Sequence, residues 1–221
     1  MTGPADHKGS GARDEVLARV RAALGGAASP SELERTYRMA GEHSAGAPEL
    51  VELIGERLRD YKATVHLTAY DLVAEVVAGI VRAEAGPEAR LVVDKEFPGQ
   101  WREGWHAVED DGLSASALDE LDGAVTTCAV AVAETGTIVL DAGPGQGRRA
   151  VTLVPDLHVC LVHAEQVVQT VPEALELLDP SRPLTWISGP SATSDIELQR
   201  VEGVHGPRTL HVLLITRPTP S

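Results

Sequence analysis

The stretch ATVHLTAYDLVAEVVAGIVRAEAGPEARLVVD, residues 63–94, decides the fold class. It begins with a β-prone run over 63–69, continues with apolar residues at helical spacing over 71–85, and ends with a short apolar strand over 89–94. Gly86-Pro87 stops the helix, because proline cannot continue it and glycine favours its end. Strand, helix and strand in this order predict a βαβ unit with parallel strands and a right-handed crossover.

The same alternation continues along the chain. The pattern predicts helices over 114–122 and 171–178 and strands over 158–165, 183–188 and 208–215. Residues 123–143 form one long β-prone stretch that holds two strands or one strand with a bend. We therefore expect an α/β fold, with a mainly parallel sheet flanked by helices.

The N-terminal residues 1–60 show helical patterns without intervening strands. Residues 1–12 are small and polar and are expected to be a disordered start. Helical patterns follow over 13–24, from about Ser31, and over 49–61 after Pro48. We therefore assign residues 1–60 to a start segment with a helical extension, and residues 61–221 to the α/β domain.

Composition limits the functions that the chain can have. Hydrophobic residues make up 43% of the 221 residues and aromatic residues only 3%, so the core must consist of Ala, Val and Leu. A formal net charge of −14 argues against binding to nucleic acids or to anionic membranes. With no apolar run of membrane-spanning length and no signal-peptide core, we expect a cytoplasmic protein without membrane insertion.

The two cysteines, Cys128 and Cys160, stand far apart in apolar surroundings. This context is typical of reduced, buried thiols. Because the chain has no CxxC motif, the sequence offers no iron–sulfur or zinc site, and we predict no metal ligands.

Glu134 lies within AVAETGTIVLD, residues 131–141, an otherwise apolar and strand-like run. A buried carboxylate is costly unless it is hydrogen-bonded, paired or neutralised, so the residue has a structural or a chemical reason to be there. In the structural interpretation, Glu134 accepts backbone amides of a turn in which Gly136 forms the bend. The alternative is a role in a functional site.

The loop DAGPGQGRRAVTLVP, residues 141–155, contains Gly143, Gly145 and Gly147 and leads into Arg148 and Arg149. Its amides and guanidinium groups suit an anion. The spacing matches neither nucleotide-binding fingerprint, so a surface hairpin loop is the favoured interpretation.

The segment SGPSATSDIE, residues 188–197, follows a predicted strand. Open α/β sheets bind ligands at the carboxyl ends of their strands, which favours a ligand-binding turn here. Ser194 and Glu197 also fit a capping box, and Asp195 suits a helix N-terminus. Both interpretations stay open.

Histidines are the remaining candidates for acid–base chemistry. His205 stands in a Gly-Pro loop before the final strand and could be a general acid or base. A lone histidine in such a loop is more often a turn residue. His211 is expected to pack within its strand, and His158 and His163 receive no predicted role.

Four motifs in this order resemble the LUD-domain family: AETGTIVL, VPDLHVCLV, WISGPSATSDIE and GVHGPRTLHVLL. The resemblance is strongest to its lactate utilization protein C branch, whose opening helix is similar to RDEVLARVRAAL. It covers most of the chain and is densest over 124–216. Two positions differ from the family pattern: Ala192 stands where Arg is often found, and Ser194 where Ala is common.

The resemblance implies a fold similar to that of ribose-phosphate isomerases and CoA transferases. It also implies a role in oxidising L-lactate to pyruvate, as one member of a three-protein system whose sister subunits carry iron–sulfur clusters. This chain would bind no cofactor of its own. The alternatives are an independent enzyme of the acyl-CoA transferase or sugar-phosphate isomerase type, or a small-molecule sensor.

By analogy with that fold, we expect Glu134 and His205 to be the catalytic residues of one pocket. Backbone amides and hydroxyls there would bind a small anionic ligand, with Arg149 or Arg208 as the counter-charge. The remaining predicted ligand-binding residues are Thr135, Gly136, Thr137, Gly189, Ser191, Thr193, Asp195 and Gly206.

Overall fold

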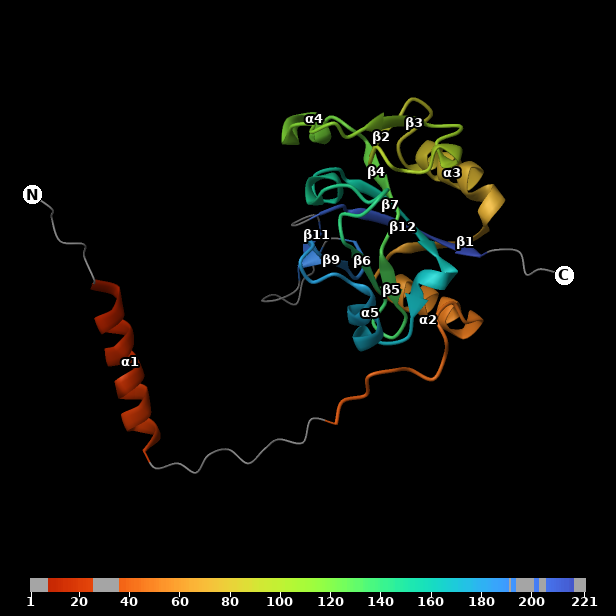
Figure 1. Ribbon diagram of the computed structural model, residues 1–221. Coiled ribbons are helices and arrows are strands. Elements are labelled where there is room, and N and C mark those ends of the chain that lie inside the picture. Colours follow the sequence, from red (N-terminus) through yellow and green to blue (C-terminus); the bar gives the residue numbers. More distant parts are fainter. Residues whose placement is uncertain (1–7, 26–35, 191, 194–200, 203–205, 217–221) are drawn as a thin grey trace, which may run out of the picture. The chain divides into compact units, whose positions relative to one another are not determined.

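The computed structural model describes residues 8–25, 36–190, 192–193, 201–202 and 206–216 (Figure 1). The chain divides into two compact units between Tyr37 and Arg38. The first unit contains helix α1 (Lys8–Leu24), which includes the helix predicted over 13–24. The helix predicted from about Ser31 begins outside the described residues.

The second unit is built on a six-stranded sheet. Its strand order is β1-β12-β7-β4-β2-β3, and every neighbouring pair is parallel, as the βαβ pattern predicted. Strand β3 was not predicted, because its four residues show no clear alternation. The strands are β1 (Thr64–Ala69), β2 (Arg90–Val93), β3 (His106–Glu109), β4 (Gly123–Thr126), β7 (Leu157–His163) and β12 (Thr209–Thr216).

A second, four-stranded sheet has the order β8-β5-β6-β9. Strands β5 and β6 form an antiparallel hairpin, β8 is parallel to β5, and β9 is antiparallel to β6. The β-prone stretch 123–143 thus holds three strands that serve two different sheets. The strands are β5 (Val130–Val132), β6 (Thr137–Leu140), β8 (Val167–Val168) and β9 (Thr185–Ile187), and β10 (Ala192–Thr193) pairs separately with β11 (Val201–Glu202).

Four α-helices and four single-turn 3₁₀ helices connect these strands. Helix α5 starts at a capping box, in which Thr170 and Glu173 bond each other's backbone amides. The α-helices are α2 (Pro48–Asp60), α3 (Val73–Glu84), α4 (Ala115–Asp119) and α5 (Val171–Leu177). The 3₁₀ helices are η1 (Tyr70–Leu72), η2 (Gly99–Trp101), η3 (Arg149–Thr152) and η4 (Ala164–Gln166).

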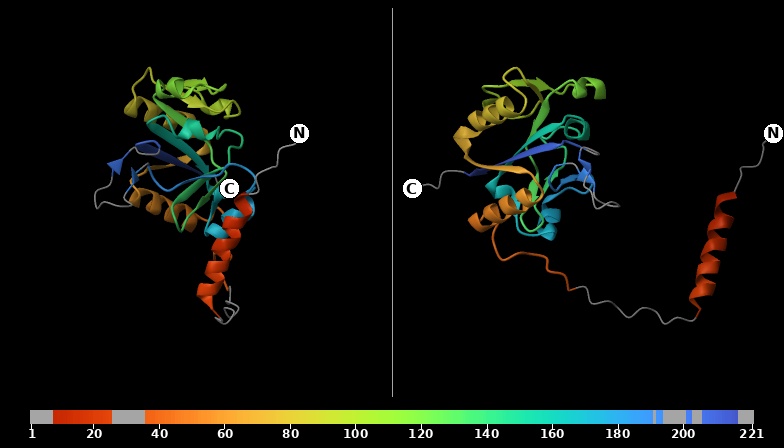
Figure 2. Two further views of the ribbon diagram at one scale, coloured as in Figure 1. Left: turned by 90° about the vertical axis from the view of Figure 1, so that its left-hand side faces the viewer. Right: turned by 180° about the vertical axis from the view of Figure 1, so that it is seen from behind.

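The two faces of the six-stranded sheet are covered by different elements (Figure 2). Helix α3 packs on the face that presents Val159 and Leu161 of β7. Helix α2 and the four-stranded sheet pack on the opposite face, which presents Cys160 and Val162. Successive side chains of one strand point to opposite faces, so β7 contributes to both cores.

Helix α2 belongs to the core of the second unit. Leu50, Ile54 and Leu58 are at most 1% exposed and pack with residues of both sheets. The division predicted between residues 60 and 61 would separate this helix from the sheet that covers it. An amphipathic pattern reveals that a helix has an apolar face, but it does not reveal which element buries that face.

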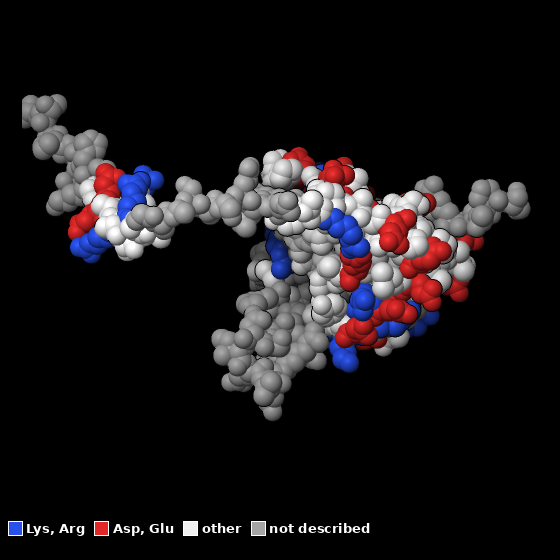
Figure 3. Space-filling view, turned by 90° about the horizontal axis from the view of Figure 1, so that it is seen from below, with Lys and Arg blue, Asp and Glu red and all other residues white. Residues whose placement is uncertain are grey.

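The surface carries the charge expected from the composition. On the face shown in Figure 3, Asp and Glu cover more area than Lys and Arg, and the two signs are interspersed. Among the described residues, no helix combines the length and the apolar character needed to cross a membrane.

Candidate functional site

A cavity of about 220 Å³ lies where the six-stranded and four-stranded sheets meet. Strands β7 and β12 supply one wall, β9 and the turn after it supply another, and η3 supplies a cationic side chain. Its lining residues are Arg149, Thr152, His158, Thr185, Trp186, Ile187, Ser188, Gly189, Pro190, Gly206, Pro207 and Leu210.

The cavity opens near the amino ends of two parallel strands, because His158 and Leu210 are the second residues of β7 and β12. The turn at 188–190 follows the carboxyl end of a strand, as expected from the sequence, but this strand is not part of the parallel sheet. That turn follows β9, which pairs antiparallel in the second sheet, whereas the carboxyl-end rule applies to open sheets with parallel strands.

Arg149 is exposed and brings a positive charge to the cavity. Its Nη1 donates to Thr152 Oγ1 at 3.2 Å, and it forms no ion pair with any acidic residue in the described ranges. The neighbouring Arg148 instead forms two bonds to the Asp110 carboxylate, of 2.7 and 3.0 Å, and this contact lowers the pKa of Asp110. Arg149 is therefore the arginine of this pair that can serve a ligand.

The glycine-rich loop before these arginines is bound to the protein itself. The Gly145 amide donates to Asp94 Oδ1 at 3.1 Å, and the Gly143 amide donates to Asp141 Oδ1 at 3.0 Å. An anion would need these same amides. The loop therefore offers no phosphate cradle of the kind considered from its sequence.

His158 forms part of the buried floor of the cavity and is 1% exposed. Its Nε2 lies 2.8 Å from Oγ1 of Thr126 on the neighbouring strand β4. Burial lowers the pKa of His158 to about 4, with a further contribution from the positive charge of Arg149, so the ring is neutral at pH 7. Sequence analysis missed this residue, because a histidine in an apolar strand gives no sign of a cavity beside it.

Hydroxyl groups connect the β5–β6 hairpin to the rim of the cavity. Thr135 Oγ1 and Thr137 Oγ1 lie 2.8 Å apart, and Thr137 Oγ1 lies 2.8 Å from Oγ of Ser188, a lining residue. Gly189 follows with φ +84°, and a Cβ there would lie 2.6 Å from Cβ of Tyr61. Only glycine fits this turn without strain.

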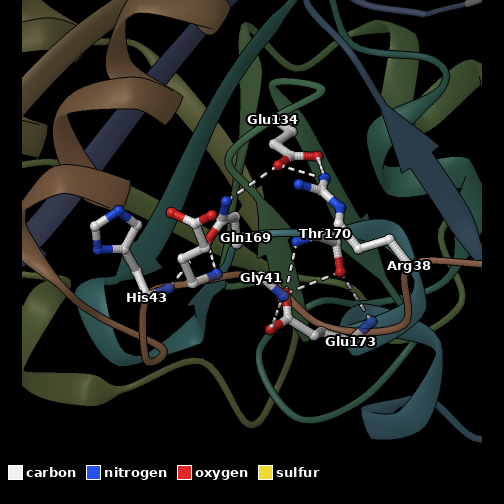
Figure 4. A network of polar contacts seen from close by, with 8 residues as sticks. Arg38, Gly41, His43, Glu134, Gln169, Thr170 and Glu173 are labelled. Atoms are coloured by element: carbon white, nitrogen blue, oxygen red, sulfur yellow. Dashed lines mark hydrogen bonds and ion pairs between the residues drawn. The ribbon is translucent and has the colours of Figure 1, made fainter.

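Glu134 lies in the turn of the β5–β6 hairpin, and the prediction that it sits within a strand was therefore wrong. Its Oε1 accepts hydrogen bonds from Arg38 Nη2 at 2.6 Å and from Gln169 Nε2 at 3.1 Å (Figure 4). It does not line the cavity. The carboxylate thus has a structural reason to be there, although its partners are side chains rather than the expected turn amides.

The segment 38–43, which carries Arg38, is held by further hydrogen bonds to Gln169 and Glu173 (Figure 4). Gln169 Oε1 accepts the amides of Glu42 and His43 at 2.7 and 3.0 Å, and Glu173 Oε1 accepts the Gly41 amide at 3.1 Å. Burial raises the pKa of Glu173, but the bonds that Glu173 accepts from Gly41 and Thr170 outweigh it, and the net shift is downward.

The structure brings three predicted ligand-binding residues together in the cavity, namely Arg149, Gly189 and Gly206, with Thr137 one hydrogen bond away. Two others lie elsewhere: Gly136 has φ +60° in the hairpin turn, and a Cβ there would meet Arg57. Arg208, considered as a counter-charge, is paired with Asp156 through a 3.0 Å bond.

The remaining predicted residues are not placed by the structure. Ser191, Asp195 and His205 lie outside the described residues, and so does the predicted capping box of Ser194 and Glu197. Thr193 is described only as part of the two-residue strand β10.

A larger groove, of about 660 Å³, runs beside α2 and the edge strand β1. Its walls are mainly apolar, and its charged side chains are exposed to solvent. The candidate site is placed in the smaller cavity because a buried imidazole meets there an arginine that has no acidic partner among the described residues. The groove is lined by Gly46, Pro48, Val51, Glu52, Gly55, Arg59, Val65, Leu67, Ala164, Glu165, Leu214 and Thr216.

Comparison with known proteins places these features in a family. The LUD domain model matches residues 38–215. A lactate utilization protein C of Deinococcus radiodurans is 45% identical over 174 residues, which cover 76% of this chain and 80% of that protein. A second lactate utilization protein C, from Halalkalibacterium halodurans, is 26% identical over 87% of this chain and 90% of its own length.

A solved structure agrees with this assignment. The crystal structure of a DUF162 family protein from Deinococcus radiodurans superposes with a TM-score of 0.64 at 36% sequence identity. The match covers 76% of this chain and 96% of that one. The α/β fold is therefore shared with a protein whose structure has been solved.

Proposed function

The chain belongs to the LUD domain family, and from this membership we propose that it acts in lactate utilisation, as a subunit of a system that oxidises L-lactate to pyruvate. It carries no iron–sulfur cluster of its own, and such clusters belong to its partner subunits. The system works in the cytoplasm. The observation that carries this proposal is the 45% identity to a lactate utilization protein C over most of both chains.

Within this role, we propose that the cavity binds a small anionic ligand. The chain has a net charge of −14, so an anion needs a local positive group, and the Arg149 guanidinium provides one beside the hydroxyls of Thr152 and Ser188. A volume of about 220 Å³ is below the ~300–1,000 Å³ typical of pockets for drug-sized ligands. It suits a molecule of a few carbon atoms.

An independent transferase or isomerase that uses Glu134 as nucleophile or base is less well supported. Such a carboxylate needs an oxygen directed at the bound substrate. Glu134 instead bonds Arg38 and Gln169 and does not line the cavity. We therefore expect Glu134 to contribute to structure rather than to catalysis.

Deletion of the gene tests the pathway, in a strain that lacks a redundant lactate-oxidising system. Growth on L-lactate should be lost, while growth on pyruvate should be normal. The wild-type gene and Glu134→Gln should restore growth, and Arg149→Gln should not. Normal growth of the deletion strain on lactate would remove the pathway assignment.

Co-purification tests the predicted partners. The tagged chain, isolated from lactate-grown cells, should bring down proteins with the visible absorption of iron–sulfur clusters, which a matched untagged strain does not yield. Isolation of the chain alone, with the pathway intact, would contradict the subunit role.

A further inference from the structure

His158 has one ring nitrogen bonded to a neighbouring strand, and its ring lines the cavity. Nε2 is bonded to Thr126, and no described residue bonds Nδ1, although the side chain is 1% exposed and lines the cavity. A ring nitrogen of a cavity-lining histidine that bonds no protein group usually bonds a water or a ligand. Nδ1 is therefore the ring nitrogen that is left to bond a ligand in the cavity.

The neighbours of Thr126 set which form of the ring faces the cavity. Thr126 Oγ1 also lies 3.8 Å from Sγ of Cys160, and when its hydroxyl donates to this sulfur, its oxygen accepts from Nε2–H of His158. The ring is neutral, because burial holds the pKa of His158 far below 7. A neutral imidazole that carries its proton on Nε2 presents a lone pair on Nδ1, and this lone pair accepts a hydrogen bond from a ligand.

The other walls of the cavity indicate which further groups a ligand would carry. Arg149 provides the fork of donors that matches a carboxylate. Leu210, Ile187 and Pro207 provide apolar surface for a short hydrocarbon part. The cavity thus combines a carboxylate partner, a hydroxyl acceptor and a small apolar wall.

We propose that His158, oriented by Thr126, is a specificity-determining residue that accepts a hydrogen bond from the hydroxyl of a small 2-hydroxy carboxylate bound through its carboxylate to Arg149. This inference rests on the proposed binding of a small anionic ligand in lactate utilisation and adds the residue that would recognise the ligand's hydroxyl. The cavity should prefer a 2-hydroxy acid to the unsubstituted acid of equal length and to the 2-oxo acid. These last two offer Nδ1 no donor.

Calorimetric titration of the full chain with L-lactate, propionate and pyruvate tests the preference at pH 7. L-lactate should bind about tenfold more tightly than propionate, the size of effect expected for one buried hydrogen bond. His158→Leu should reduce lactate binding to the level of propionate, and Arg149→Gln should weaken binding of all three acids. Equal binding of lactate and propionate by the wild-type chain would overturn the inference.

Imidazole nitrogen NMR of the labelled chain gives a second readout that does not depend on how well a variant folds. The His158 signals should show the proton on Nε2, and lactate should shift the Nδ1 signal. A proton on Nδ1, or signals unchanged at saturating lactate, would also overturn the inference.

The outcomes separate this inference from the proposed function. Loss of carboxylate binding and of growth in Arg149→Gln, without any preference for lactate, leaves the proposed function standing and removes only the 2-hydroxy assignment. Absence of carboxylate binding in the wild type, with normal growth of Arg149→Gln, removes both the ligand site and its specificity.

Discussion

Nε2 of His158 lies 2.8 Å from Oγ1 of Thr126, and this hydrogen bond joins the neighbouring parallel strands β7 and β4 inside the core. Both side chains are at most 1% exposed. Burial at this position favours the neutral imidazole over the charged one. The charge state of one histidine is thus linked to the packing between two central strands.

We expect the free energy of unfolding to fall as the pH drops from about 6.5 to about 4. The folded pKa of His158 is about 4, below its ordinary value of 6.5, so the unfolded chain binds more protons within this window. The shift corresponds to a loss of about 3 kcal/mol. Burial also lowers the pKa of His66 and His211, which act in the same direction. Urea denaturation at a series of pH values measures the loss.

The matched variant is His158→Gln, which keeps a polar group near Thr126 and cannot titrate. Its unfolding free energy should be lower at pH 7 and should change less between pH 6.5 and 4. The same pH dependence in both proteins would contradict the assignment to His158.

Gly189→Ala should lower the free energy of unfolding by about 1–3 kcal/mol, since it forces a side chain into the left-handed region. The added Cβ would also lie 2.7 Å from the carbonyl oxygen of Tyr61. Gly79→Ala is the control, because no atom lies within 4 Å of a Cβ at that exposed position of α3. It should raise stability by up to about 1 kcal/mol. Thermal denaturation compares the two, and equal effects would refute the strain at Gly189.

Gln169→Ala should destabilise the fold more than Glu134→Gln. The Gln169 side chain satisfies the amides of Glu42 and His43, and loss of these bonds should cost about 1–3 kcal/mol. The Arg38–Glu134 pair is 59% and 33% exposed, and such pairs contribute about 0–1 kcal/mol. Chemical denaturation ranks the variants, and a larger loss in Glu134→Gln would show that the ion pair fixes the segment.

Neither cysteine should react with a thiol reagent such as Ellman's reagent in the native protein. Cys128 and Cys160 are 3% and 0% exposed, and burial raises the pKa of both thiols, that of Cys160 to about 12. The thiolate is the reactive form, so burial suppresses both access and ionisation. Both thiols should be titrated once guanidinium is added. Rapid labelling of either one under native conditions would contradict this prediction.

Local patterns predicted the main elements of the fold well. The run over 63–94 predicted β1, α3 and β2 to within a few residues, because alternation and helical spacing are direct signs of backbone conformation. The two-residue strand β8 was not found, since two residues show no period. The division of strands between two sheets also depends on pairing, which no single strand reveals.

The candidate site was predicted only in part. Arg149, Gly189 and Gly206 were predicted from the loops that hold them and from the analogy with the fold, and they do meet in one cavity. Glu134 was grouped with them by analogy with the fold that the resemblance implied, but its carboxylate bonds Arg38 instead. His158 was missed because its importance comes from Thr126, which lies 32 positions away in sequence and becomes its neighbour only through the pairing of β4 with β7.

Strand β9 is three residues long and lies at the edge of its sheet, where it forms one wall of the cavity. Edge elements with few backbone bonds open far more often than a whole domain unfolds. Detachment of this single strand would expose the cavity floor while the six-stranded sheet stayed intact. The rate at which a bound molecule leaves the cavity would then depend on the local opening of β9. A ligand that contacts both sheets would slow hydrogen exchange of the backbone amides of that strand.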